Sequence, residues 1–275
     1  MKNKIMPTII ATSLITILLS PIAVMAAQPM VGLGTTASFA ILSGETITNT
    51  GTTTIGGTAG GDVGMHPGSD FTGQSTITIS GALHLADATA NTAKIDLGTA
   101  YDDAAGRSNV TIVPSELGGT TLVAGTYASA DGTFTITGTL TLNAENDPNA
   151  VFIFQTTKTL ITASASTINL INGAQTCRIF WKVGSSVTLG TNSTFIGHVF
   201  ALTSISAQTG AIIQGQLLVR NGSVTLEGNT ITNNICTVNG GTLPYTATSN
   251  YTTLMIGGLL LALGAVSLLA KKYYE

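Results

Sequence analysis

Few side chains in this sequence have the types and spacing that enzyme chemistry requires. Acid–base catalysis and glycoside hydrolysis need paired carboxylates, whereas Asp62, Asp70 and Asp131 each stand alone in a Gly- and Ser-rich segment typical of turns. The three histidines are also far apart and lack the spacing of metal ligands: His66, His84 and His198. Serine-hydrolase and phosphate-binding motifs do not occur. The sequence therefore predicts neither an enzyme nor a bound cofactor or metal.

The two cysteines, Cys177 and Cys236, offer a different kind of chemistry. In an exported protein such a pair can form one disulfide bond. The bond would close a loop of about 60 residues and contribute roughly 4 kcal/mol in the chain-entropy description. The sequence leaves open whether the two Cα atoms lie within bridging distance.

Hydroxyl side chains recur at a regular spacing in the second half of the chain. The segments 187–189, 205–207 and 224–226 each place a hydroxyl residue between two apolar ones, and their starts are 18 and 19 residues apart (187 to 205 to 224). Longer apolar segments, 178–183, 197–202 and 215–220, precede them with similar spacing, and 151–155 comes one copy earlier. A repeat of roughly 18–20 residues with two or three short strands is typical of a β-solenoid coil.

Alternation along these strands divides their side chains between core and surface. Val187, Ile205 and Val224 are expected to point inward, because successive strand residues face opposite sides. The neighbouring outward residues form the first candidate ladder: Thr159, Ser186, Thr188, Ser204, Ser206, Ser223 and Thr225. The next turn supplies a second candidate set: Thr162, Thr191, Asn192 and Thr209. Most outward Thr residues of any β protein are ordinary strand formers, so each residue alone is a weak signal.

One stretch has a helical period instead. Small and apolar residues three or four positions apart predict a helix over about 86–105: Ala86, Ala90, Ala93, Leu97, Tyr101 and Ala104. Asp87 suits the start of this helix, and Gly106 its end. We expect the helix to lie along the solenoid with its small side chains against a sheet.

The N-terminus has the pattern of an export signal. Lys2 and Lys4 precede an apolar run over 9–22, and Ala26 ends a segment of small and apolar residues. This order predicts a signal peptide over 1–26 that is cleaved after Ala26. A retained N-terminal membrane anchor is the alternative.

The C-terminus has a second apolar run, 254–270, followed by a basic tail. Together with Leu243, Pro244, Thr246 and Ala247, segment 243–275 resembles a sortase cell-wall sorting signal. The resemblance implies cleavage after Thr246 and attachment of its carboxyl group to peptidoglycan, although Ala247 stands where Gly is usual. A single transmembrane anchor is the alternative. Both place the domain over 27–242 at the cell surface.

Composition narrows the range of partners. Charged residues make up 8% of the chain and the net charge is −3, which excludes a nucleic-acid-binding surface. The apolar fraction of 44% is too high for a disordered chain. A folded β protein with a polar but nearly uncharged surface remains, and a monomer is expected.

Seven segments resemble a bacterial and fungal family of ice-binding proteins: 37–43, 47–51, 61–64, 100–107, 116–119, 147–155 and 183–195. The resemblance implies a mainly β fold, a right-handed, discontinuous, three-faced β-solenoid whose coils are out of sequence order, with one long helix alongside. It also implies adsorption to ice, which inhibits growth and recrystallisation. Segment 56–60 is longer than is usual for the family and is expected to extend a corner loop.

Ice would explain the low charge and the hydroxyl ladder together. Thr carries a methyl and a hydroxyl on a stiff, β-branched side chain, and parallel strands space such groups about 4.8 Å apart, close to the oxygen repeat of ice. We therefore expect the first candidate ladder, together with Thr191 and Thr209, to contact the ice surface. A cell-surface adhesin that binds a polymer or another cell is the alternative function.

Overall fold

A computed structural model describes residues 28–237 of the chain. The predicted signal peptide, the sorting motif and the apolar segment 254–270 lie outside the described residues. No helix within 28–237 is long and apolar enough to span a membrane. Chain contacts define two units, Met1–Cys236 and Thr237–Glu275, and the fold described below belongs to the first.

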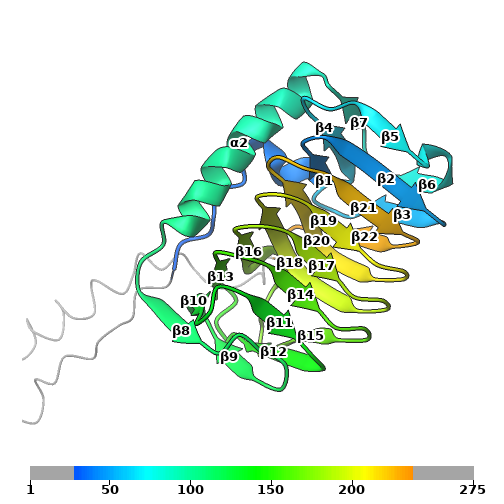
Figure 1. The fold of residues 1–275 in the computed structure, drawn as a ribbon. Helices are drawn as coiled ribbons and strands as arrows, with labels where there is room; N and C mark the ends of the chain where they lie inside the picture. Colours follow the sequence, from blue (N-terminus) through cyan, green and yellow to red (C-terminus); the bar gives the residue numbers. More distant parts are fainter. Residues whose placement is uncertain (1–27, 238–275) are drawn as a thin grey trace, which may run out of the picture. The chain divides into compact units, whose positions relative to one another are not determined.

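Short parallel strands stack into a β-solenoid with three faces (Figure 1). One face is a seven-stranded sheet, called here the seven-stranded face. In spatial order its strands are β11 (Phe134–Ile136), β14 (Leu160–Thr162), β17 (Val187–Leu189), β19 (Ile205–Ala207), β21 (Val224–Glu227), β2 (Thr46–Thr50) and β5 (Asp70–Thr72).

The other two faces share a 15-stranded sheet. The helix-side face contains β8 (Val110–Val113), β10 (Gly125–Ser129), β13 (Phe152–Thr156), β16 (Ile179–Val183), β1 (Phe39–Ser43), β4 (Asp62–Met65) and β7 (Leu83–Leu85). The third face contains β9 (Thr121–Val123), β12 (Thr139–Asn143), β15 (Thr167–Ile171), β22 (Thr230–Thr232), β3 (Thr53–Gly56) and β6 (Ile77–Ile79). The short helices are η2 (Gly34–Ser38), η3 (Gln74–Thr76) and η4 (Thr176–Arg178).

Two long strands, β18 (Thr194–Ala201) and β20 (Ile212–Val219), run through both of these faces. Each bends at a glycine with positive φ, Gly197 at 119° and Gly215 at 150°. The two glycines are register partners, and a Cβ on Gly215 would lie 2.0 Å from the Gly197 carbonyl oxygen. The corner between the third face and the helix-side face therefore requires glycine at both positions.

The coils do not follow sequence order. The N-terminal strand β2 pairs with β21, β1 pairs with β20, and β3 pairs with β22, so the first coil stacks on the last one. Figure 1 shows these blue strands beside the orange ones. The solenoid and the out-of-order coils expected from the resemblance are confirmed.

The predicted core residues stack in register. Val187 pairs with Ile205, Ile205 with Val224 and Val224 with Ile47, and all four are buried. Aromatic rings fill one part of the core. Phe154 stacks on Trp181 with ring centroids 3.9 Å apart, and the Trp181 indole N–H donates to the Ile196 carbonyl at 3.0 Å. Each buried side chain of this size stabilises the fold by roughly 1.5–3 kcal/mol.

Helix α2 (Ala88–Ala105) lies along the helix-side face (Figure 1). The Asp87 carboxylate caps its first turn by accepting from the Ala90 N–H at 2.8 Å. The predicted stripe is buried from Ala90 onward and packs against side chains such as Phe180 and Phe200. Ala86 is a correction, because it is exposed, precedes the helix and has a φ of 52°. The chain turns there before the helix begins.

Cys177 and Cys236 form a disulfide bond, with Cα atoms 5.4 Å apart. The bridge that the sequence left open is therefore present, and it joins η4 to the segment after β22.

Candidate functional site

The seven-stranded face brings the first candidate ladder together as two parallel rows. In the central row, Thr188 pairs with Ser206 and Ser206 with Thr225. The edge row lies two residues before the central row, directly before strands β14, β17, β19 and β21, and holds the remaining candidates: Thr159, Ser186, Ser204 and Ser223. All seven side chains are half-buried, as expected for outward residues within a sheet or directly beside it.

The central row is longer than the sequence indicated. Thr225 pairs with Thr48 and Thr48 with Thr72, so two N-terminal strands extend it at one end. At the other end Thr188 pairs with Ile161, and Ile161 with Thr135. Segment 46–48 was missed because it lies far from the repeat in sequence, and its alternation alone does not reveal which coil it joins.

The hydroxyls of the two rows differ in their availability. Those of Thr188, Ser206 and Thr225 make no hydrogen bond to another described residue. In the edge row, the Ser223 hydroxyl accepts from the Thr46 hydroxyl at 2.8 Å, and the Ser204 hydroxyl accepts from the Ser223 N–H at 3.2 Å. The hydroxyls of Thr188, Ser206 and Thr225 therefore remain free for an external surface, whereas two hydroxyls of the edge row are engaged within the fold.

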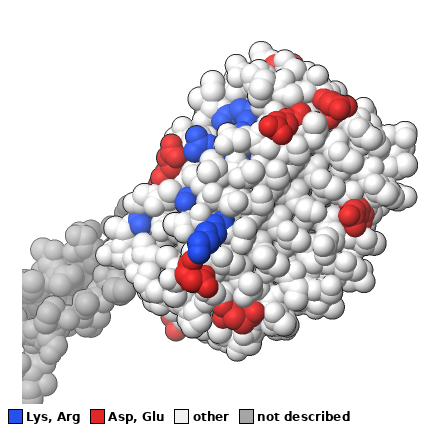
Figure 2. Space-filling view, in the orientation of Figure 1, with Lys and Arg blue, Asp and Glu red and all other residues white. Residues whose placement is uncertain are grey.

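The seven-stranded face is almost uncharged. Its strands contain only two ionisable side chains, Asp70 and Glu227, both near its borders. Figure 2 shows charged side chains around the margins and a broad uncharged area over the strands between them. A ligand that contacts the central row meets hydroxyl and methyl groups rather than mobile hydrated charges.

Glu116 closes one end of this face. Its carboxylate accepts from the Gly118 N–H at 2.6 Å, the Thr137 N–H at 2.8 Å, and the Thr135 and Thr137 hydroxyls at 3.0 Å. Burial opposes ionisation of Glu116, but these hydrogen bonds outweigh it and hold its pKa below the usual value. The hydroxyl of Thr135 is therefore used within the fold.

The second candidate set, at the next turn, is less uniform. Thr162 is a correction, because it is buried and its hydroxyl accepts from the Gly190 N–H at 2.8 Å. The Thr209 hydroxyl donates to the Glu227 carboxylate at 2.8 Å, so it already has a partner. Thr191 is half-buried and Asn192 is exposed at the corner between the seven-stranded face and the third face.

The third face carries another threonine row, whose members were not among the candidates from the sequence. Its members are register partners across seven strands: Thr139, Thr167, Thr194, Ile212, Thr230, Thr54 and Thr78. All are exposed or half-buried, and none of these threonine hydroxyls bonds to a described residue. The strands of this face contain no Asp, Glu, Lys or Arg. The Thr-apolar alternation in 76–79 and 139–142 was visible, but its register was not.

The isolated acids and histidines have structural surroundings. Asp62 accepts from the Ala82 N–H at 2.7 Å, and Asp131 accepts from the Thr133 N–H at 2.9 Å within its turn. His198 is buried, and burial lowers its pKa to about 4, so the ring is neutral at pH 7. Within residues 28–237, no three His, Cys, Asp or Glu side chains gather in a way that could hold a metal ion.

Comparison with known proteins identifies two matching families. Residues 41–232 match the model of the ice-binding-like family, and residues 237–272 match that of the LPXTG cell wall anchor motif.

Similar proteins extend the first match over most of the chain. An ice-binding protein of Nostoc sp. is 40% identical over 203 residues, 73% of each chain, and one of Flavobacterium frigoris is 34% identical over 74% of this chain and 76% of its own. The crystal structure of an ice-binding protein from an Antarctic biological consortium superposes with a TM-score of 0.72 at 41% identity, covering 75% of this chain and 92% of that one. That of the ascomycete Antarctomyces psychrotrophicus gives 0.70 at 39% identity, covering 74% and 98%.

Proposed function

Because the chain belongs to the ice-binding-like family, we propose that its solenoid domain adsorbs to ice crystals through the seven-stranded face and thereby inhibits ice growth and recrystallisation. The observation that carries this proposal is the central row, in which Thr188, Ser206, Thr225 and Thr48 stand in register with free hydroxyls. Parallel strands repeat about every 4.8 Å, so the row presents a regular lattice to a regular crystal.

The side chains of this row suit ice for two physical reasons. Threonine is stiff about χ1, so little conformational entropy is lost when its methyl and hydroxyl groups are held against a crystal. Each strand is also fixed by a neighbour on both sides from β14 to β2, so the face is ordered before it meets ice. Preorganisation of this kind lowers the cost of binding.

The third face is a second ice-contacting surface in this proposal. Its row of six threonines and Ile212 shares the three properties of the central row: register, free hydroxyls and absence of charge. The two faces meet at the corner that holds Thr191. Two faces at an angle to each other would present hydroxyl rows to two different ice planes.

Surface display follows from the C-terminal match. The LPXTG cell wall anchor motif indicates an exported protein attached to the cell wall. We propose that segment 1–26 is removed on export and that a sortase cleaves after Thr246, joining this residue to peptidoglycan. An ice binder held in this way would attach ice to the cell.

The experiment that tests the function is a freezing-hysteresis and recrystallisation assay on residues 27–242. We expect faceted crystals and slower recrystallisation than in buffer with an equal mass of serum albumin. Crystals that grow as they do in buffer would favour the alternative, an adhesin that binds a polymer or another cell. The same solenoid and anchor would serve that function.

A further inference from the structure

The solenoid ends at a covalent cross-link. After β22 the chain runs through 233–235 to Cys236, whose sulfur is bonded to Cys177 in η4, directly before β16. The anchor-matching segment begins one residue later, at position 237. Tension transmitted through the cell-wall anchor therefore reaches the domain at the disulfide bond.

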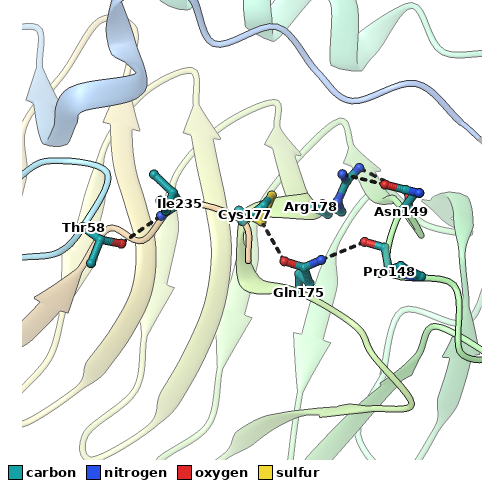
Figure 3. The surroundings of a disulfide bond; sticks show 8 residues. Thr58, Pro148, Asn149, Gln175, Cys177, Arg178 and Ile235 are labelled. Carbon is teal, nitrogen blue, oxygen red and sulfur yellow. Dashed lines mark hydrogen bonds between the residues drawn. A yellow bond between two sulfur atoms is a disulfide. The ribbon is translucent and has the colours of Figure 1, made fainter. Parts of the chain in front are cut away.

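Both halves of this cross-link are braced by hydrogen bonds to other coils (Figure 3). On the Cys236 side, the Ile235 N–H donates to the Thr58 hydroxyl at 3.2 Å, and the Thr58 N–H donates to the Asn234 side chain at 3.1 Å. On the Cys177 side, the Arg178 guanidinium donates to the Asn149 side-chain oxygen at 2.9 Å. The contacts reach the first coil in one direction and the β12–β13 connection in the other.

Without the disulfide bond, this tension would act directly on one short strand, β22. β22 has three residues, which pair with β20 on one side and β3 on the other. Short parallel strands under tension from one end lose their hydrogen bonds one after another, so β22 would peel away first, followed by β21. With the bond, tension also enters at Cys177, 59 positions earlier in the chain, and the strands between the cysteines have a second support.

We propose that the Cys177–Cys236 disulfide is the mechanical clamp of the wall tether, passing tension from the anchor into the β16 coil so that the C-terminal strands do not peel. This inference rests on the proposed attachment through Thr246. The clamp lies at the corner between the third face and the helix-side face, the corner that Gly197 and Gly215 form in neighbouring coils. In a three-sided solenoid this corner lies opposite the seven-stranded face, so the disulfide bond is remote from the central row of that face.

A single-molecule pulling experiment tests the clamp without ice. Protein spanning residues 27–246 carries a click-reactive residue at position 188, which is one attachment point in every measurement. The second attachment point is Thr246 in the 188–246 geometry and residue 28 in the 28–188 control geometry. In the 188–246 geometry we expect the Cys177→Ser/Cys236→Ser variant to lose the high-force unfolding event of the oxidised protein and to extend at low force. In the 28–188 geometry the same variant should keep its unfolding force, because that path does not cross the disulfide bond.

Two results would overturn the clamp: an equal drop in unfolding force in both geometries, which would show that the bond has no particular effect on tension from the C-terminal side, or no drop in the 188–246 geometry. Reduction of the same wild-type molecule between pulls repeats the comparison if the serine variant folds poorly. Arg178→Ala keeps the disulfide bond but removes the hydrogen bond from the Arg178 guanidinium to Asn149. Its unfolding force should lie between those of the oxidised wild type and the double serine variant. No ice is present in this experiment, so a negative result does not contradict the proposed ice binding. Conversely, a protein that does not shape ice still gives an unfolding force that can be measured.

Discussion

Thr188 of β17 and Ser206 of β19 are register partners, and both hydroxyls are free on the seven-stranded face. This pair lies at the centre of the proposed ice-binding surface. We expect Thr188→Tyr or Ser206→Tyr to lower freezing hysteresis, because one bulky ring lifts the flat face away from the crystal. The measurement is hysteresis at equal concentration, with circular dichroism and Tm as checks on the fold.

Ile95→Tyr is the matched control for this substitution, since Ile95 is 64% exposed on helix α2, away from both threonine rows. Its hysteresis should equal that of the wild type. Unchanged freezing hysteresis in the Thr188 and Ser206 variants would contradict the assignment of the seven-stranded face as an ice-binding surface.

Thr54 and Thr230 are adjacent in the row of the third face. We expect Thr230→Tyr to abolish adsorption to one set of ice planes while the planes bound by the seven-stranded face stay occupied, and Thr188→Tyr to do the reverse. The measurement is the pattern that fluorescently labelled protein leaves on a single-crystal ice hemisphere. If Thr230→Tyr leaves every labelled plane in place, ice binding belongs to the seven-stranded face alone.

Loss of the disulfide bond should lower stability without altering the seven-stranded face. Closing a loop of this length contributes roughly 4 kcal/mol in the chain-entropy description. We expect Cys177→Ser/Cys236→Ser to lower the free energy of unfolding by about this amount, measured by urea titration. Crystal shaping near 0 °C should persist in the fraction that stays folded, because the bond lies at the corner opposite the seven-stranded face.

The buried His198 is expected to make the fold less stable at acidic pH. Burial lowers its folded-state pKa from 6.5 to about 4, so the unfolded chain binds a proton at a pH where the folded protein does not. Its contribution to stability is present above pH 6.5 and is lost as the pH falls toward 4. Unfolding titrations at pH 6.5 and 4.5 should show a smaller loss for His198→Gln than for the wild type. Equal losses would assign the acid sensitivity to other groups.

Thr246 is the residue that the sorting-signal resemblance joins to the wall. We expect Thr246→Ala to prevent covalent attachment, so that boiling detergent extracts the protein from intact cells. Wild-type protein should remain in the wall until a muramidase digests the glycan. Extraction of the wild type by detergent alone would favour a membrane anchor.

Local features of this protein were predictable because their causes are local. The period of two along a strand determined that Val187 points inward and Thr188 outward, and the three- and four-residue spacing of small side chains located the helix to within two residues. Buried Thr162 shows where this reasoning ends, because its position on a corner is determined by the hydrogen bond from the Gly190 N–H of the next coil. Alternation cannot report such a contact.

By itself the sequence determined the solenoid repeat, the helix, the low charge and the hydroxyl ladder of the C-terminal coils. The tertiary structure decided that Thr48 extends that ladder, that seven residues from distant segments form a second row, and that Cys236 reaches Cys177. The reason is physical. Side-chain direction follows from backbone geometry within a few residues, whereas the pairing of parallel strands from distant segments depends on which stacking of whole coils buries the core best.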